Sequence, residues 1–421
     1  MASPMERKNP NISDSLPTFS CVAVKHLVQL RCVSNLWNSL LSLDRFARKH
    51  FKVSTSKQSD ITNPNIIDSL PTLPFDIITE ILSRLPVKIL LQFQCVCKSW
   101  NSLISDHKFA RKQFNLSTNP NLHVISYDDP SQRYVLRSYP LQSVFTDLTT
   151  NFIQLGFPFN SPYKHYLHYI VGSCDGILCL ADYHNCFVVL WNPSIRKFKE
   201  LPSFEKPQVV GSAKFGFGYD NISHNYKVVV VYNSYRSAIN EDTAKIKVYN
   251  LRTNSWRTIQ TFPFSTYFHP DRSGVYVSGT INWLAATKWC LPLFIVSFDL
   301  GKDSYQKIFT PEHGRINARS KLCVLRDCLC IISYYDVWVM KEYGIKESWT
   351  KLFKVSNLPE QSMSSFLTKA LYIFEDDQVL LVERWKKKLI VYDLKNDTFK
   401  ITVKFPTLPE ICTESLISPC F

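Results

Sequence analysis

The sequence predicts a mainly β protein in which a small all-α module near the N-terminus precedes a β-propeller of about six blades. One observation is an amphipathic helical stretch at residues 73–86, with further short helical segments up to residue 116. The other is a change of texture after Asn115, where short apolar runs alternate with turn residues and pairs of aromatic residues recur.

Composition limits the class of protein. With 421 residues, 45% of them hydrophobic, the chain can hold a small module and one large domain. No run approaches the roughly 18 apolar residues of a membrane span, and the opening "MASPMERKNPNISDS" lacks a signal core. We therefore expect a protein of the nucleus, the cytoplasm or both, with its 13 cysteines as free thiols. No C-x-x-C pair occurs, and we expect neither a metal nor a cofactor.

The net charge of +14 has two interpretations. An excess of Lys and Arg can indicate a nucleic acid or an acidic partner. However, the sequence has neither a basic helix nor an aromatic RNA-binding signature. We interpret the charge as a solvated surface and expect no nucleic-acid and no membrane partner.

The N-terminal part contains a duplication. Residues 24–55 and 87–118 are identical at 18 of 32 aligned positions, and "NPN" precedes each copy, at Asn9 and at Asn63. The first copy lacks nine residues, because only "FSCVA" separates its leader from the repeat. The second copy has "LPFDIITEILSRLP" at this place.

This insertion predicts one amphipathic helix. Ile77, Ile78, Ile81, Leu82 and Leu85 share one face at 3.6 residues per turn. A proline suits the first turn, and a second one at the end stops the helix. We expect the ridge from Ile77 to Leu85 to be left bare for another molecule, although packing on the rest of this chain is an equal alternative.

Three further short helices follow in the sequence. The second contains Leu90, the third runs through Trp100, and the last is capped by Asp106. So small a helical unit buries too little surface to be very stable by itself.

The stretch "LPFDIITEILSRLPVKILLQFQCVCKSWNSLISDHKF" at 73–109 resembles an F-box over its whole length. The resemblance implies docking on a Skp-type adaptor protein and, through it, on a cullin and a RING protein. The residues expected at or near that contact are Leu73, Pro74, Ile77, Ile81, Leu82, Leu85, Pro86, Val87 and Leu90.

The first copy departs from this pattern, since it has lost the amphipathic insertion. We interpret it as a degenerate partial F-box that cannot dock by itself, with a tandem active pair as the alternative. The expected organisation is a disordered tail at 1–20, the partial duplicate at 21–56, a linker at 57–70, the F-box at 71–116 and the propeller at 120–420.

The propeller prediction rests on a recurring hairpin. An aromatic residue ends an apolar run, a polar turn follows, and a second aromatic residue arrives seven positions later. Facing aromatic residues stabilise such hairpins across the two strands. The pairs are Tyr127–Tyr134, Trp191–Phe198, Tyr249–Trp256, Phe298–Tyr305 and Tyr392–Phe399, with Trp338–Trp349 as a version with a longer turn.

The first hairpin lacks partner strands nearby in the sequence. We expect the segment "ESLISP", Glu414 to Pro419, to pair with it and to close the ring. "VGSCDGILCL", "VLWNPSIRKFKELP", "FGFGYD" and "ESLISP" resemble the F-box-associated, kelch-like domain of plant F-box proteins. The resemblance covers residues 120–420 and implies a C-terminal domain that selects a substrate.

No chemical motif supports an enzyme. The histidines lack metal-binding spacing, and Asp175–Gly176 has the residues of a two-residue hairpin turn. Propellers bind through loops at their faces, where Tyr, Trp, His and Arg make good anchors. The candidate substrate-binding residues are Tyr235, Arg236, Tyr267, His269, Trp289 and Arg315.

The sequence therefore predicts a non-catalytic substrate-recognition subunit of an SCF-type (Skp–cullin–F-box) ubiquitin ligase. One alternative is a protein-interaction propeller that acts without a ligase. Another is a glycan- or ligand-binding propeller. Docking on the adaptor separates the first hypothesis from the second.

Overall fold

The computed structural model describes residues 74–420 except short stretches, which are 118, 129, 131–132, 146–151, 158–168, 183–186, 205–212, 235–242, 260–266, 269–272, 287–291, 357–366, 384–387 and 406. The chain divides into two compact units, Met1–Ser83 with Phe93–Leu103 and Arg84–Gln92 with Ile104–Phe421. The predicted tail at 1–20, partial duplicate at 21–56 and linker at 57–70 lie outside the described residues, and so does Leu73.

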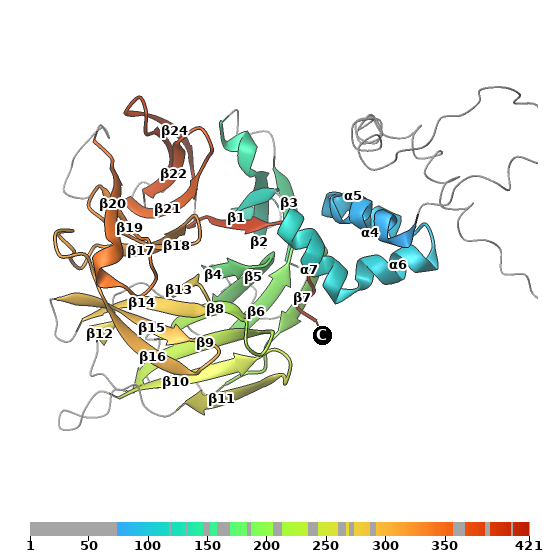
Figure 1. Cartoon of the computed structure of the whole chain (residues 1–421), viewed down its shortest axis with the longest axis horizontal. Coiled ribbons are helices and arrows are strands. Elements are labelled where there is room, and N and C mark those ends of the chain that lie inside the picture. The colour runs from blue at the N-terminus through green and yellow to red at the C-terminus, as the bar shows by residue number, and fades with distance from the viewer. Residues whose placement is uncertain are drawn as a thin grey trace, which may run out of the picture. The chain divides into compact units, whose positions relative to one another are not determined.

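The helical segments predicted from the sequence are present. They are α4 (Phe75–Ser83), α5 (Val87–Phe93), α6 (Lys98–Ser105) and α7 (His107–Leu116) (Figure 1). The backbone N–H groups of Ile77 and Ile89 donate to the carbonyls of Pro74 and Pro86, so each proline precedes the first turn of a helix. Asp106 is the expected N-cap, because its carboxylate accepts from the backbone N–H groups of Lys108 and Phe109 at 2.8 and 3.0 Å.

Six antiparallel sheets hold the described strands, and we number them as blades in chain order (Figure 1). Blade 1 has β25 (Glu410–Thr413), β1 (Pro120–Asp128), β2 (Arg133–Pro140) and β3 (Ile153–Gly156). Blade 2 has β4 (Tyr169–Cys174), β5 (Ile177–Asp182), β6 (Phe187–Asn192) and β7 (Lys197–Glu200). Blade 3 has β8 (Lys214–Asp220), β9 (Asn225–Ser234), β10 (Thr243–Asn250) and β11 (Ser255–Ile259).

The remaining three blades follow the same order. Blade 4 has β12 (Tyr267–Phe268) and β13 (Val275–Val277), which both pair with β14 (Thr280–Ala286), then β15 (Leu293–Asp299) and β16 (Ser304–Phe309). Blade 5 has β17 (Lys321–Leu325), β18 (Cys328–Ser333), β19 (Asp336–Met340) and β20 (Trp349–Lys354). Blade 6 has β21 (Leu367–Ile373), β22 (Gln378–Glu383), β23 (Lys388–Asp393) and β24 (Thr398–Lys404). Single turns of 3-10 helix lie at η2 (Leu141–Phe145) and η4 (Lys346–Ser348).

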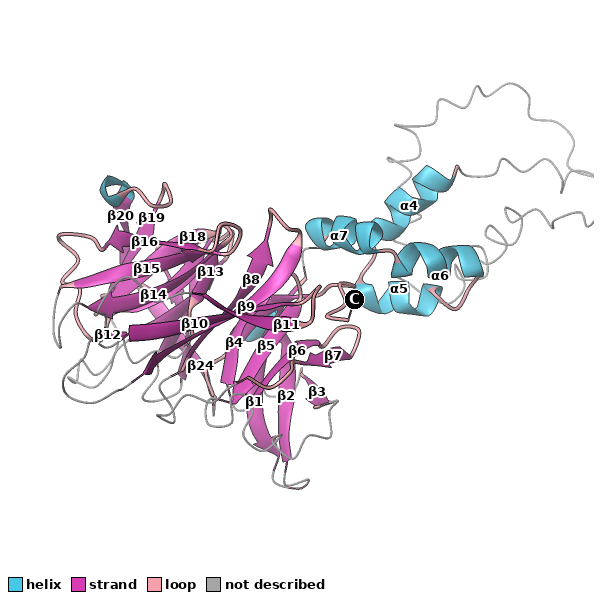
Figure 2. Ribbon diagram, turned by 90° about the horizontal axis from the view of Figure 1, so that it is seen from below, coloured by secondary structure: helices cyan, strands magenta, loops and turns pink. Residues whose placement is uncertain are grey.

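The blades form a closed ring, which confirms the predicted six-bladed propeller. The first strands of successive blades contact one another in the order β25, β4, β8, β13, β17 and β21, and β21 contacts β25 again. Figure 2 shows the sheets as successive groups of magenta arrows. The hydrophobic clusters lie between neighbouring blades. For example, Val229 and Val248 of blade 3 pack with Trp283 and Val296 of blade 4. Such clusters join blades 1 and 2, 3 and 4, 4 and 5, 5 and 6, and 6 and 1.

The ring closes through a strand other than the expected one. β25, Glu410–Thr413, pairs antiparallel with β1, whereas Glu414 to Pro419 follow without forming a strand. The expectation that "ESLISP" pairs with the first hairpin is therefore wrong by four residues. Instead, Ser415 and Ile417 are buried, and the Asn192 side-chain amide donates to their carbonyl oxygens at 3.0 and 2.8 Å. Buried polar partners, and not strand pairing, hold this segment.

The aromatic hairpins follow the prediction in five of six cases. Tyr127 and Tyr134, Trp191 and Phe198, Tyr249 and Trp256, Phe298 and Tyr305, and Tyr392 and Phe399 lie directly opposite each other in the strand registers. The prediction for the sixth pair is wrong, because Trp338 lies opposite Lys351 and Trp349 lies opposite Met340. A bulge at Val337/Trp338 and the helical turn η4 shift the register of this longer connection.

Candidate functional site

Helix α4 presents an apolar surface at residues 75–81. Phe75 is 53% exposed, and Ile77, Ile78 and Ile81 are half-buried. Phe75, Ile78 and Leu82 lie at positions i, i+3 and i+7, so a single stripe runs from solvent into the interior. The sequence reasoning missed Phe75, although its spacing to Ile78 was a usable signal. The exposed end of this stripe is available to a partner.

The other end of the stripe is buried. Leu82, Leu85, Val87 and Leu90 are at most 2% exposed. The expectation of a bare ridge from Ile77 to Leu85 is therefore wrong at Leu82 and Leu85. A helical module of this size must bury its own leucines to fold, which leaves only part of the stripe for docking. Pro74 is exposed and Pro86 is half-buried.

The segment Arg84–Gln92 is tied to helix α7. The side-chain amide of the buried Gln113 donates to the carbonyl oxygen of Leu85 at 3.4 Å. Both residues belong to the unit that contains the propeller. In the other unit, the rings of Phe93 and Trp100 pack with centroids 5.3 Å apart.

Most of the candidate substrate-binding residues lie outside the described residues, namely Tyr235, Arg236, His269 and Trp289. Tyr267 belongs to β12 and faces Ala286 across the sheet. Arg315 has an exposed side chain and a left-handed backbone with φ of 45°. Its carbonyl oxygen accepts from the hydroxyl of Ser333 at 2.9 Å, which holds this connection against blade 5.

Strand directions give two faces of the ring. A parallel bridge between Phe215 and Ser273 shows that β8 and the residues leading into β13 run the same way, so β9 and β14 also run in parallel. The C-terminal ends of β9 and β14 therefore lie at one face of the ring. The hairpin turns at Asp175–Gly176 and Asn221–His224 belong to the other face.

Asp175 and Gly176 form the expected turn. Cys174 pairs with Ile177, and the two turn residues have φ of 51° and 83°. A Cβ at residue 176 would collide with the side chain of Ser415 and lie 2.9 Å from the carbonyl oxygen of Thr413. Glycine is therefore required here by both backbone conformation and space.

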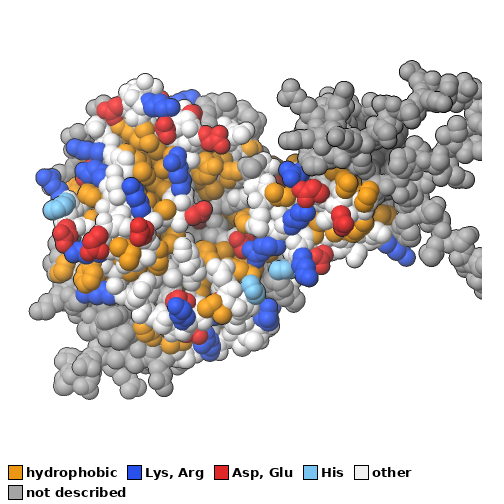
Figure 3. All heavy atoms as spheres, in the orientation of Figure 1, with side chains coloured by type: hydrophobic (Ala, Val, Ile, Leu, Met, Phe, Trp, Pro, Cys, Tyr) orange, Lys and Arg blue, Asp and Glu red, His pale blue; other side chains and the backbone are white. Residues whose placement is uncertain are grey.

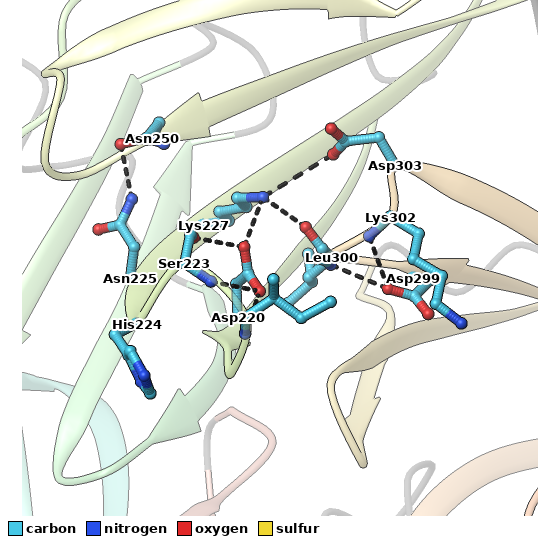
Figure 4. Close-up of polar contacts among 12 residues, drawn as sticks. Asp220, Ser223, His224, Asn225, Lys227, Asn250, Asp299, Leu300, Lys302 and Asp303 are labelled. Carbon is cyan, nitrogen blue, oxygen red and sulfur yellow. Dashed lines mark hydrogen bonds and ion pairs between the residues drawn. The ribbon is translucent and has the colours of Figure 1, made fainter.

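A cluster of charges joins blades 3 and 4, as Figure 4 shows. The Lys227 ammonium lies 2.8 Å from the Asp220 carboxylate and 3.8 Å from that of Asp303, and it donates to the carbonyl oxygen of Leu300. Burial favours the neutral form of Asp220, but hydrogen bonds from Lys227 and Ser223 outweigh it and lower the pKa of this carboxyl. Arg257 also pairs with Asp303. Since these charges neutralise one another, the cluster is a structural connection.

Isolated titratable groups occur in the interior. Burial lowers the pKa of His123 to about 4 and raises that of the Cys412 thiol. Within the described residues, no group of three or more His, Cys, Asp or Glu side chains has the arrangement of a metal site. The helices that the structure describes are too short and too polar to cross a membrane.

Two family models match this chain. Residues 70–112 match the F-box domain, and residues 98–418 match the F-box associated beta propeller domain. An F-box/kelch-repeat protein of Arabidopsis thaliana is 33% identical over 353 residues, which cover 79% of this chain and 90% of the relative. The F-box protein CPR1 of the same plant is 28% identical over 386 residues, covering 83% and 90%. The solved WD40 repeats of RRP9 align over 68% of this chain and 81% of theirs, with 9% identity and a TM-score of 0.35.

The short helices at residues 75–116 and the six-bladed propeller are the two parts that these family models describe. The chain belongs to the family of F-box proteins with an F-box-associated β-propeller domain.

Proposed function

We propose that this protein is the substrate-recognition subunit of an SCF-type ubiquitin ligase. The F-box docks on a Skp-type adaptor, which connects it to cullin and RING proteins, and the propeller binds the protein to be ubiquitinated. The observation that carries the proposal is the apolar surface of α4, where Phe75 is 53% exposed at the start of the F-box match. An exposed aromatic side chain beside half-buried isoleucines is a typical anchor for a partner protein.

In this proposal the chain has no catalytic residues of its own. The ubiquitin-loaded enzyme supplies the chemistry, and the chain raises the local concentration of a target lysine by holding both partners. The adaptor contact comprises Pro74, Ile77, Ile81 and Phe75 as surface residues, with Leu73, Pro86 and the buried Leu82, Leu85, Val87 and Leu90 at or behind it.

We propose that the substrate binds at the ring face where β9 and β14 end. The candidate substrate-binding residues are those expected from the sequence, namely Tyr235, Arg236, Tyr267, His269, Trp289 and Arg315. On the face of the molecule seen in Figure 3, the described Lys and Arg side chains are scattered among acidic and hydrophobic ones. We propose that the substrate is a protein of the nucleus, the cytoplasm or both.

The test is capture of a purified Skp-type adaptor by the full chain. Phe75→Ser is expected to weaken capture by at least tenfold, because a central aromatic anchor commonly contributes 2 kcal/mol or more, about 30-fold in affinity. Phe309→Ser is the matched control, since Phe309 is also 53% exposed but lies in blade 4. Equal capture by wild type and Phe75→Ser would contradict the proposed contact. No capture by the wild type would favour the propeller that acts without a ligase.

A further inference from the structure

Arg111 connects helix α7 to the propeller. Arg111 of α7 forms an ion pair with Asp175, the first residue of the β4–β5 turn. Its second guanidinium nitrogen donates to the Tyr226 hydroxyl at 3.1 Å, and this hydroxyl donates in turn to the Asp175 carboxylate at 2.7 Å. The three groups therefore close a triangle of hydrogen bonds between one helix and two blades.

The aromatic surroundings make this contact stronger than an ordinary surface ion pair. The Arg111 guanidinium lies 4.4 Å from the centroid of the Tyr219 ring. The side chains of Arg111 and Asp175 are 25% and 17% exposed, so water screens them only in part. Burial disfavours the charge of Arg111, but the adjoining Tyr226 and Asp175 outweigh it and raise its pKa.

The same turn holds the ring closure. The Ser415 hydroxyl donates to the backbone carbonyl of Asp175 at 2.8 Å, just after the closing strand β25. Asp175 thus contacts α7 with its side chain and the C-terminal segment with its backbone. Two residues further along α7 from Arg111, Gln113 holds the carbonyl of Leu85. Hydrogen bonds therefore connect Ser415 to Asp175 and Asp175 to Arg111 of α7, and Gln113 of α7 to the F-box segment Arg84–Gln92.

We propose that Arg111 and Asp175 form a joint that fixes the F-box segment Arg84–Gln92 in one orientation on the propeller, so that Arg111 is a positioning residue for ubiquitin transfer. The role in transfer rests on the proposed function, whereas the joint itself does not. Only a stiff connection holds a substrate on the ring at a defined distance from the ubiquitin-loaded enzyme. A small misplacement of the target lysine would lower the rate of ubiquitin transfer, because the reaction depends on proximity.

Hydrogen exchange in the full chain tests the joint directly. In Arg111→Ala and Asp175→Asn, amides of α7 and of residues 84–92 are expected to exchange about tenfold faster, as for loss of one charge-assisted hydrogen bond. Asn tolerates the left-handed backbone of residue 175, so this variant keeps the turn. The double variant is expected to exchange no faster than either single one, because both changes remove the same interaction.

Lys108→Ala is the matched control, because Lys108 is an exposed residue of α7 and its loss removes the same charge. Exchange in β18 and β19, in the distant blade 5, reports whether the propeller remains folded. If Arg111→Ala fails to fold, Arg111→Lys replaces it. Lysine keeps the charge but cannot donate to Asp175 and Tyr226 in the same fork geometry, so intermediate protection is expected. Unchanged exchange of α7 in Asp175→Asn, or additive effects in the double variant, would overturn the joint.

The positioning role has its own readout. Labels at Gln92 and Asn396, introduced as unnatural amino acids, report the distance distribution between the segment Arg84–Gln92 and blade 6; both residues are exposed. Arg111→Ala is expected to broaden this distribution while affinity for the purified adaptor stays within twofold of wild type. A distribution of unchanged width would overturn the positioning role. Failure of the wild type to bind the adaptor would instead overturn the proposed function and leave the exchange result intact.

Discussion

The ammonium of Lys227 lies 2.8 Å from the carboxylate of Asp220, and both side chains are at most 5% exposed. The two residues belong to the β8–β9 hairpin of blade 3, and Lys227 also reaches the carbonyl of Leu300 and the carboxylate of Asp303 beside blade 4. Two neighbouring blades are therefore joined by buried charges as well as by the apolar cluster between them.

Replacing Lys227 by methionine is expected to destabilise the propeller by about 3–5 kcal/mol, because Asp220 is then left buried without its counter-ion. Chemical denaturation of the full chain measures the effect. Lys302→Met, at an exposed position in the next turn, serves as the control and should leave the unfolding free energy within about 0.5 kcal/mol of wild type. Equal stability of Lys227→Met and wild type would show that the pair contributes nothing.

We expect the folded protein to lose stability in mild acid because of the buried His123. Burial lowers its pKa to about 4, and the unfolded chain has a histidine pKa of about 6.5. Because the unfolded state binds the proton first, stability is fully present above pH 6.5 and falls as the pH falls toward 4. The expected loss between pH 7.5 and pH 5 is about 2 kcal/mol from this residue.

His123→Leu is expected to remove this part of the pH dependence, as measured by denaturation at both pH values. His313→Leu changes an exposed histidine and should retain the wild-type dependence. The same pH slope in all three chains would show that His123 is not the source.

Removal of residues 414–421 is expected to lower the melting temperature of the propeller by several degrees. The buried amide of Asn192 loses its partners, and blade 2 loses its contact with the end of blade 1. Asn192→Ala tests the same contact with one side chain and is expected to cost about 1–3 kcal/mol, since two buried carbonyls lose their donor. Asn221→Ala, at an exposed position, is the control. An unchanged melting curve after both changes would contradict the role of this segment in closing the ring.

Leu85 and Ile77 are expected to affect adaptor binding for different reasons. Leu85 is 2% exposed, so Leu85→Ala should cost about 2–5 kcal/mol and weaken docking by loosening the helices. Ile77 is half-buried, so Ile77→Ala should reduce adaptor capture with little change in helix content. Circular dichroism and adaptor capture, measured on the same samples, separate the two effects. Loss of helix in Ile77→Ala would place that residue in the interior instead.

Local patterns in the sequence were sufficient for elements whose determinants are close together. The seven-residue spacing of Tyr249 and Trp256 predicts their cross-strand pairing, because a short turn leaves few possible registers. The N-cap Asp106 and the turn Asp175–Gly176 are likewise encoded within a few residues.

Features that depend on distant parts of the chain were missed or misplaced. Arg111 and Asp175 are separated by 64 residues, and no local pattern indicates that they meet. The burial of Leu85 is another case, since a helical period identifies an apolar face but not which part of it the folded module covers. The closing strand was placed four residues late, because neighbouring short apolar segments around Ile411 and Ile417 are equally plausible as an edge strand until the partner register is known.

The pairing of β25 with β1 has a consequence for synthesis of the protein. Residues 410–413 leave the ribosome after every other strand of the ring, so blade 1 waits for nearly the whole chain with its inner edge uncovered. Products of premature termination upstream of residue 410 keep that edge exposed permanently. A truncated copy therefore differs from the finished chain by an exposed strand edge, which can pair with another chain and promote aggregation.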